Sequence, residues 1–128
     1  MKILRLPIKA QWYGKIYAGL KGDEYRDIKG HYISRFFEGK LDRALHDLFE
    51  TELQCSDAPL ADIAADYNLK VREYDAVELT VGYRRDAPKS LFEWKGLSIG
   101  EGRIEWGAEP GKRVFRIHLG NRITNTNT

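Results

Sequence analysis

Three ionisable residues, Lys21, Glu24 and Arg26, lie close together in a stretch that reads Gly-Leu-Lys-Gly-Asp-Glu-Tyr-Arg from Gly19 to Arg26. A lysine in a partly dry pocket can lose its proton and act as a nucleophile or base, and a neighbouring cation favours that loss. Beside Glu24, by contrast, the amine keeps its proton. Lys21 and Glu24 are therefore the candidate catalytic residues, and all three are candidate ligand-binding residues.

The same triplet also has a purely structural interpretation. Side chains two residues apart on a strand point to one face, so Glu24 and Arg26 can form an ion pair there while Lys21 is a solvated turn residue. In either interpretation we expect Glu24 and Arg26 to face the same cavity within ion-pair distance. A structural pair alone implies no ligand.

The elements around the triplet follow from periodicity. Residues 2–8 alternate as a strand that ends near Pro7. Residues 10–18 carry apolar side chains at helical spacing, with Gly14 as a mild cost and Gly19 as the residue that closes the helix. A second strand is expected over 24–28. Lys21 thus falls in the turn between a helix and a strand.

This stretch matches the pattern G-x-K-x-x-E-x-R and, with Leu6-Pro7-Ile8-Lys9 and Trp12-Tyr13, resembles the activating-signal-cointegrator homology (ASCH) family. Tyr83-Arg84, Glu93-Trp94-Lys95-Gly96 and Gly107-Ala108-Glu109 also look like its small phage and bacterial members. The resemblance covers both ends of the chain and misses the middle. It implies an α+β fold, a PUA-like small mixed β-barrel with peripheral and inserted helices, and a cleft at the motif that binds RNA or a modified nucleotide.

Some compact members of that family are hydrolases, either amidohydrolases on acylated nucleosides or ribonucleases, and the resemblance would make Lys21 the activated amine. This chain departs from the amidohydrolases, which carry a Thr where Glu24 stands. Their later acid has three candidates here, Glu93, Glu101 and Glu105. We therefore rank binding above hydrolysis and leave enzymatic activity open. A third hypothesis is a protein-interaction adaptor that docks through the helices inserted at 41–67.

Further candidate ligand-binding residues lie in the second half of the chain. Tyr83 and Arg84, with Arg85, Lys89 and Lys95, form a basic stretch suited to a phosphate backbone, or a solvated loop. Ser98, like Thr80, would place a hydroxyl in the barrel mouth. Rings that could stack on a base, or simply fill the core, are Trp94, Trp106, Tyr25, Tyr83 and Phe92.

Metal and cofactor sites are not expected. The three histidines, His31, His46 and His118, are scattered, and Cys55 is the single cysteine. The stretch Gly107–Arg113 superficially resembles a phosphate loop, but it is one residue short, contains Pro110 and lacks the Ser or Thr that meets magnesium. We interpret it as a turn and predict neither a metal nor a cofactor.

The remaining pattern predicts helices in the middle of the chain and strands after it. An apolar face from Leu41 to Leu53 marks the clearest helix, and Ser56-Asp57-Ala58-Pro59 predicts the capped start of a second one. Residues 31–37 receive no assignment. Strands are expected over 77–83, 91–99 and 113–119. We predict one domain over 1–123, closed by pairing of the first and last strands, and a flexible polar tail over 124–128.

Composition is that of a soluble globular protein: 128 residues, 42% hydrophobic and 31% charged, with 12% aromatic. A net charge of +2 permits contact with nucleic acid but is weak for a duplex-DNA binder.

With one cysteine, and no signal-peptide or membrane-spanning segment expected, we predict a cytoplasmic protein. The predicted partner is single-stranded RNA or a modified nucleotide, bound more weakly as salt rises, with no membrane contact; the oligomeric state is left open.

Overall fold

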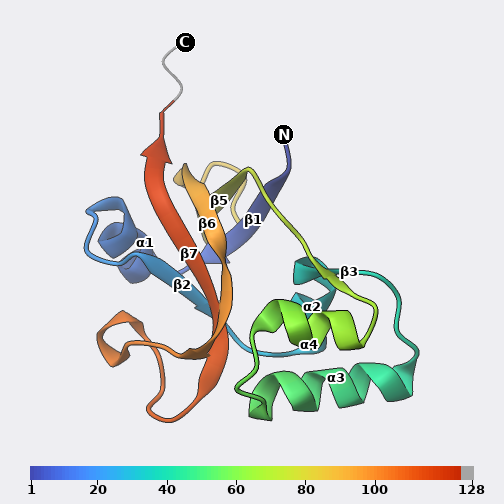
Figure 1. Ribbon diagram of the computed structural model, residues 1–128. Coiled ribbons are helices and arrows are strands. Elements are labelled where there is room, and N and C mark those ends of the chain that lie inside the picture. Colours follow the sequence, from blue (N-terminus) through green and yellow to red (C-terminus); the bar gives the residue numbers. More distant parts are fainter. Residues whose placement is uncertain (125–128) are drawn as a thin grey trace. The chain divides into compact units, whose positions relative to one another are not determined.

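The computed structural model describes residues 1–124 and has the predicted α+β class (Figure 1). Of the predicted tail over 124–128, residues 125–128 lie outside the described residues. In chain order the elements are β1 (Ile3–Ile8), α1 (Ala10–Tyr17), β2 (Asp23–Arg26), α2 (Gly30–Phe36), β3 (Phe37–Glu38), α3 (Arg43–Cys55), α4 (Leu60–Asp66), β4 (Lys70–Val71), β5 (Ala76–Val81), β6 (Lys89–Glu101), a 3-10 turn (Ile104–Trp106) and β7 (Arg113–Ile123).

Five strands form one mixed sheet in the order β1-β5-β6-β7-β2, and β3 and β4 form a separate pair. Strand β1 runs parallel to β5, with Ile3 opposite Ala76 and Ile8 opposite Val81, whereas β5 and β6 are antiparallel. The prediction that the first and last strands pair is wrong for the described residues, because β1 neighbours β5 and β7 lies between β6 and β2. A parallel partner requires a long crossover connection, which the segment between β1 and β5 supplies.

The chain divides into two compact units. The first contains residues 1–24, 73–96 and the segment from 117 onward. Its core includes the buried side chains Leu4, Leu6 and Ile8 of β1 and Val77 and Leu79 of β5. Alternation predicts all five, but Val81, at the next inward position, is only half-buried and Tyr83, also in the predicted strand, is exposed. Among residues 1–124 no helix combines the length and apolar character needed to cross a membrane.

The second unit contains residues 25–72 and 97–116, and aromatic rings fill its core. The Phe36 ring meets Phe115 edge-on at 5.0 Å between centroids, and Phe37 meets Phe49 in the same way at 5.0 Å. Helix α2 supplies Phe36 and buries Ile33 as well. The sequence gives this helix no capping side chain and a glycine at its first position, so burial of two apolar side chains is what stabilises it.

Two expectations for the central helices need correction. Only Phe49 and Leu53 of the predicted apolar face of α3 are buried, while Leu45 and Leu48 are exposed. The predicted side-chain cap before α4 is also wrong, because Pro59 occupies the N-cap position and Ser56 Oγ instead accepts from the Ala58 amide at 3.1 Å. Asp42 does cap α3, accepting from the Leu45 amide at 2.9 Å.

Helix α1 ends in a Schellman motif that aims the chain into β2. The Leu20 amide donates to the Lys15 carbonyl at 2.8 Å and the Gly19 amide to Ile16 at 3.0 Å, with Gly19 at φ +78°. This left-handed conformation is what Gly19 is needed for, since a Cβ added there would meet no atom within 4 Å. The turn therefore depends on backbone conformation alone.

We expect opposite effects from alanine at the two glycines of this helix. Gly19→Ala should lower the free energy of unfolding by about 1–2 kcal/mol, because a Cβ is disfavoured in the left-handed region. Gly14→Ala, in the helix interior and likewise without a neighbour within 4 Å of the added Cβ, should raise it by about 0.5–1 kcal/mol. Urea denaturation followed by circular dichroism measures both, and effects of the same sign would contradict this account of the turn.

Candidate functional site

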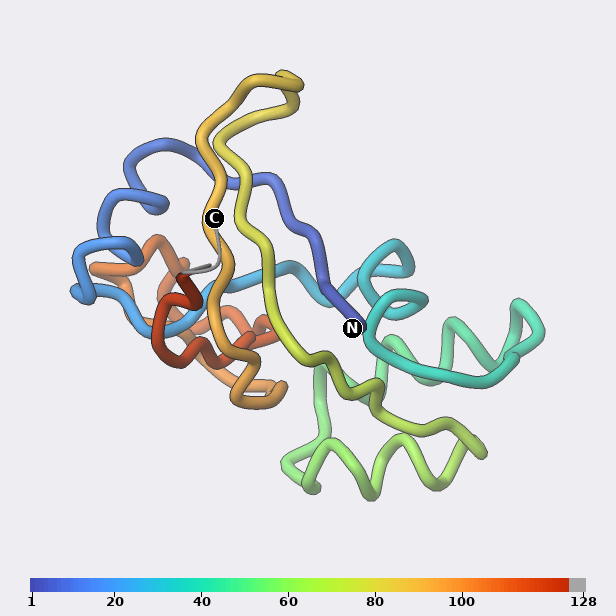
Figure 2. Tube along the Cα trace, turned by 90° about the horizontal axis from the view of Figure 1, so that it is seen from above, coloured from blue at the N-terminus to red at the C-terminus, as the bar shows by residue number. Residues whose placement is uncertain are grey.

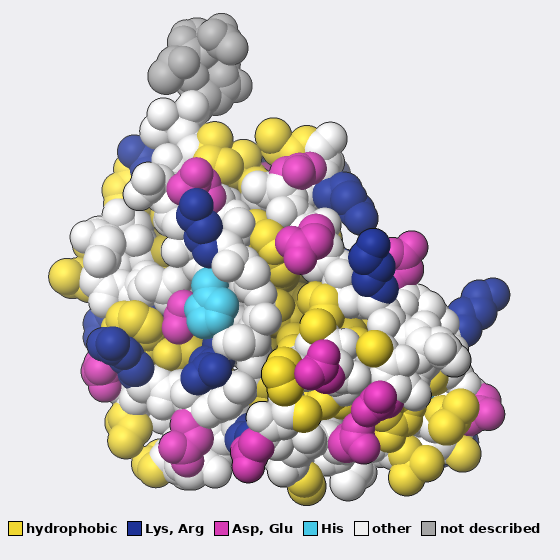
Figure 3. Space-filling view, in the orientation of Figure 1, with side chains coloured by type: hydrophobic (Ala, Val, Ile, Leu, Met, Phe, Trp, Pro, Cys, Tyr) yellow, Lys and Arg dark blue, Asp and Glu magenta, His cyan; other side chains and the backbone are white. Residues whose placement is uncertain are grey.

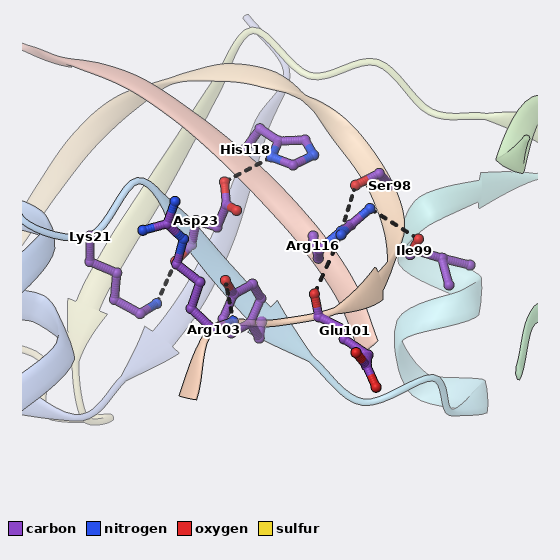
Figure 4. Close-up of polar contacts among 9 residues, drawn as sticks. Lys21, Asp23, Ser98, Ile99, Glu101, Arg103, Arg116 and His118 are labelled. Carbon is purple, nitrogen blue, oxygen red and sulfur yellow. Dashed lines mark hydrogen bonds and ion pairs between the residues drawn. The ribbon is translucent and has the colours of Figure 1, made fainter. Parts of the chain in front are cut away.

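Lys21 lies just beyond the Schellman motif, in the segment that leads into β2. The Leu119 amide of β7 donates to the Gly22 carbonyl at 2.9 Å and anchors this segment. The Lys21 side chain is buried, with the residue 2% exposed, and its Nζ donates to Glu24 Oε1 at 2.7 Å. The same Nζ donates to the Asp23 carbonyl oxygen at 2.5 Å (Figure 4). The alternative of a solvated turn lysine is thereby excluded.

The pair is buried on both sides, because Glu24 is only 7% exposed. Taking two charges out of water is unfavourable unless they are well paired and hydrogen-bonded, so this arrangement is weak as a device for stability. The ring of Trp12, on α1, lies 5.9 Å from Lys21 Nζ, within range of a cation–π contact. A buried ammonium, a buried carboxylate and an indole thus lie together at the mouth of β2.

A second ionisable pair joins β2 to β7. His118 Nδ1, on β7, is 2.8 Å from Asp23 Oδ1, and both side chains are partly exposed (Figure 4). A carboxylate at this distance fixes the orientation of an imidazole, as it does for histidines that act as general bases. The sequence does not reveal this pair, because the two residues are 95 positions apart and only pairing within the sheet brings them together.

Arg26 and Ser98, two other predicted site residues, belong to the second unit and have partners there. Arg26 Nη1 donates to the Tyr32 hydroxyl at 3.1 Å, and its guanidinium lies 5.7 Å from that ring. Ser98 Oγ accepts from Arg116 Nε at 3.0 Å, and the same guanidinium donates to the carbonyls of Ile99 and Glu101 (Figure 4). The expected ion pair between Glu24 and Arg26 stays a prediction.

Tyr83 and Arg84 lie in the turn that connects β5 to β6, yellow to orange in Figure 2. Tyr83 is 91% exposed, and Arg84 Nη2 lies 3.2 Å from Asp86 Oδ2 in an exposed pair. Tyr83 is therefore no part of the core. Of the predicted site residues, the structure brings Lys21 and Glu24 together, whereas Tyr83 and Arg84 lie on this separate turn.

The remaining candidate rings mostly have protein neighbours. Trp94 donates from its indole to Glu73 at 3.2 Å and packs edge-on against Tyr74. Trp106 carries the Arg103 guanidinium 4.6 Å above its ring. Phe92 is buried. Trp12, which belongs to the ASCH resemblance but not to the candidate stacking rings, is the ring that accompanies the buried ion pair.

Charge is distributed in small clusters. On the face drawn in Figure 3, acidic and basic side chains of the described residues are interspersed. Within residues 1–124 no group of three or more His, Cys, Asp or Glu side chains could hold a metal ion. The side chains at β2 can donate and accept hydrogen bonds.

The chain was compared with protein-family models, with curated proteins and with solved structures, and none of them matches it.

Proposed function

We propose that this protein binds RNA or a modified nucleotide, with the base recognised at Lys21 and Glu24, and that its strands form a PUA-like barrel of the kind the ASCH resemblance implies. The observation that carries the proposal is the buried Lys21–Glu24 pair beside Trp12. Buried charges persist only where they are paired, and such a pair contributes little to stability. The proposal gives this pair a role that stability does not supply.

The chemistry of the pair suits the edge of a nucleobase. A base edge combines amino or imino N–H donors with carbonyl acceptors. Glu24 accepts from the former and Lys21 donates to the latter, and an indole such as Trp12 offers a surface on which a base can stack. One carboxylate and one ammonium 2.7 Å apart match neighbouring positions on such an edge.

A second candidate is a small hydrolase, and the Asp23–His118 pair is the observation that favours it. An oriented imidazole can take a proton from water or from a hydroxyl group. Lys21 is a poor nucleophile in this setting, because its amine is engaged in an ion pair with Glu24. A hydrolase built here would therefore use His118 as its base rather than Lys21.

The test is binding of nucleosides and of a short single-stranded RNA at low salt, measured by isothermal titration calorimetry. We expect wild-type protein to bind and Glu24→Gln to bind at least about tenfold more weakly, because a hydrogen bond to a charged group contributes roughly 1.5–3 kcal/mol. Glu78→Gln, which removes a carboxylate paired with Arg5 on the surface, is the matched control and should bind normally.

Acylated cytidine separates binding from hydrolysis. We expect it to be recovered unchanged after incubation. Release of cytidine that survives purification and disappears in His118→Ala would replace the binding proposal with the hydrolase, and release that disappears only in Lys21→Met would restore Lys21 as the nucleophile. Absence of binding to every nucleoside and to RNA at low salt would contradict both the binding proposal and the hydrolase proposal.

A further inference from the structure

The turn that ends at Arg113 forms part of a cavity in the second unit. The cavity has a volume of about 330 Å³ and is lined by Asp27, Ile28, Lys29, Gln54, Gly111, Lys112 and Arg113. The stretch from Gly107 to Arg113 lacks the sequence of a nucleotide-binding phosphate loop. Its last residues nonetheless contribute two cations to one concave surface, beside a third cation from the segment between β2 and α2.

The lining is strongly cationic for its size. The lining contains three basic side chains, those of Lys29, Lys112 and Arg113, and one carboxylate, that of Asp27, so its formal charge is +2. Asp57, outside the lining, pairs with Arg113. Asp27 holds both lysines: its Oδ1 lies 3.0 Å from Lys112 Nζ and its Oδ2 lies 3.7 Å from Lys29 Nζ. One acidic group thus gathers two ammonium groups without neutralising both.

Arg113 is fixed more rigidly than the lysines. Its Nη2 donates to the Ser56 carbonyl at 2.6 Å and to the Leu53 carbonyl at 3.3 Å, and its Nη1 to Asp57 Oδ1 at 3.3 Å. Its Nε is buried and has no hydrogen-bond partner among the described residues. The contacts of Nη1 and Nη2 hold the guanidinium group of this cavity-lining residue in place.

We propose that this cavity is a phosphate-binding site that takes a phosphate group, either as inorganic phosphate or as part of a nucleotide or RNA. Guanidinium and ammonium groups are the side chains that bind phosphate most strongly, the first through directed N–H groups and the second as a point charge. Gly111, at φ +75°, turns the backbone into the lining without a side chain. This site is independent of the one proposed at Lys21 and Glu24.

The charge state of Lys112 is consistent with this role. The hydrogen bond from Lys112 to Asp27, together with the charge of that carboxylate, raises the lysine pKa above its ordinary value. Lys112 therefore carries its positive charge throughout the neutral range. The attraction of Lys112 for a phosphate anion therefore persists across the neutral range.

The experiment is a titration of ¹⁵N-labelled protein with inorganic phosphate at low salt, followed by amide chemical shifts. We expect saturable shifts centred on residues 27–29 and 111–113. Lys112→Gln and Lys29→Gln should each weaken binding roughly fivefold or more, because each removes a charge-assisted contact, whereas Asp27→Asn should strengthen it. Lys70→Gln, an exposed lysine of β4 in the same unit, removes the same charge and should leave affinity unchanged.

Three further ligands distinguish the sources of the phosphate group and test the inference. Shifts with inorganic phosphate identify a site for the free anion. Shifts with cytidine 5′-monophosphate or a short RNA, without shifts from phosphate, identify the esterified group. Equal shifts from cytidine itself would show recognition of the base and overturn the proposal. Absence of shifts with all of these ligands, or equal weakening in Lys70→Gln, would also overturn it, whether or not nucleosides bind at Lys21.

Discussion

Removing either partner of the Lys21–Glu24 pair should destabilise the protein by about 3–5 kcal/mol, because the charge left behind is buried without its partner. Lys21 is 2% and Glu24 7% exposed, so solvent cannot take the place of the lost group. Urea denaturation of Lys21→Ala and Glu24→Ala, followed by circular dichroism, measures the effect. The exposed pair of Arg84 and Asp86 is the matched control, and Arg84→Ala should cost less than about 1 kcal/mol.

The double variant with Lys21→Met and Glu24→Leu separates stability from recognition. Replacing both charges by apolar side chains of similar size leaves no unpaired ion, so we expect it to recover most of the stability lost in the single variants. It should still fail to bind nucleosides if the pair reads a base edge. If the single variants had a free energy of unfolding within about 1 kcal/mol of wild type, the Lys21–Glu24 pair would be solvated. If the double variant bound nucleosides, this pair would not be part of the binding site.

Phe115→Ala should lower the free energy of unfolding by a similar amount, about 3–5 kcal/mol, through the cavity it leaves in the second unit. The Phe115 side chain is completely buried, and its ring packs against Phe36 at 5.0 Å and Phe37 at 6.1 Å between centroids. Because α2 depends on burial of Phe36, its amides should also exchange with solvent faster. Hydrogen exchange together with urea denaturation measures both effects.

Tyr83→Ala is the control for Phe115→Ala, since it removes an aromatic ring that is 91% exposed. Its effect should lie within about 0.5 kcal/mol of wild type. A small effect at Phe115, or protection of α2 that is unchanged, would show that the aromatic cluster does not hold this helix. The two variants together thus separate the loss of a packed ring from the loss of an aromatic residue as such.

Sequence periodicity correctly predicts those helices and strands whose own residues carry a clear apolar pattern. The alternation of Leu4, Leu6 and Ile8 predicts β1 and its buried face, and Gly19 marks the end of α1. Periodicity does not predict α2, which has only seven residues and a glycine at its start, because packing against the aromatic core stabilises this helix. It also fails for Leu45 and Leu48, since an apolar stripe wider than the surface it covers leaves part of itself exposed.

The candidate site was predictable in its residue types and not in its geometry. The spacing of Lys21 and Glu24 across a turn identifies them as candidates, but burial depends on the surrounding structure and cannot be seen in the octet. Asp23 and His118 lie near each other only because β7 hydrogen-bonds to the segment that leads into β2. The cavity at Lys112 likewise joins residues from three parts of the second unit.

The parallel pairing of β1 with β5 has a consequence for how the chain is made. Ile3 pairs with Ala76, so the first strand leaves the ribosome long before its partner exists. At roughly 5–20 residues per second, synthesis of the intervening segment takes about 4–15 s. The apolar side chains of β1 remain uncovered for that interval, while α3 and α4, whose contacts are local, can already form. Completion of the sheet is therefore a late event in the biogenesis of this protein.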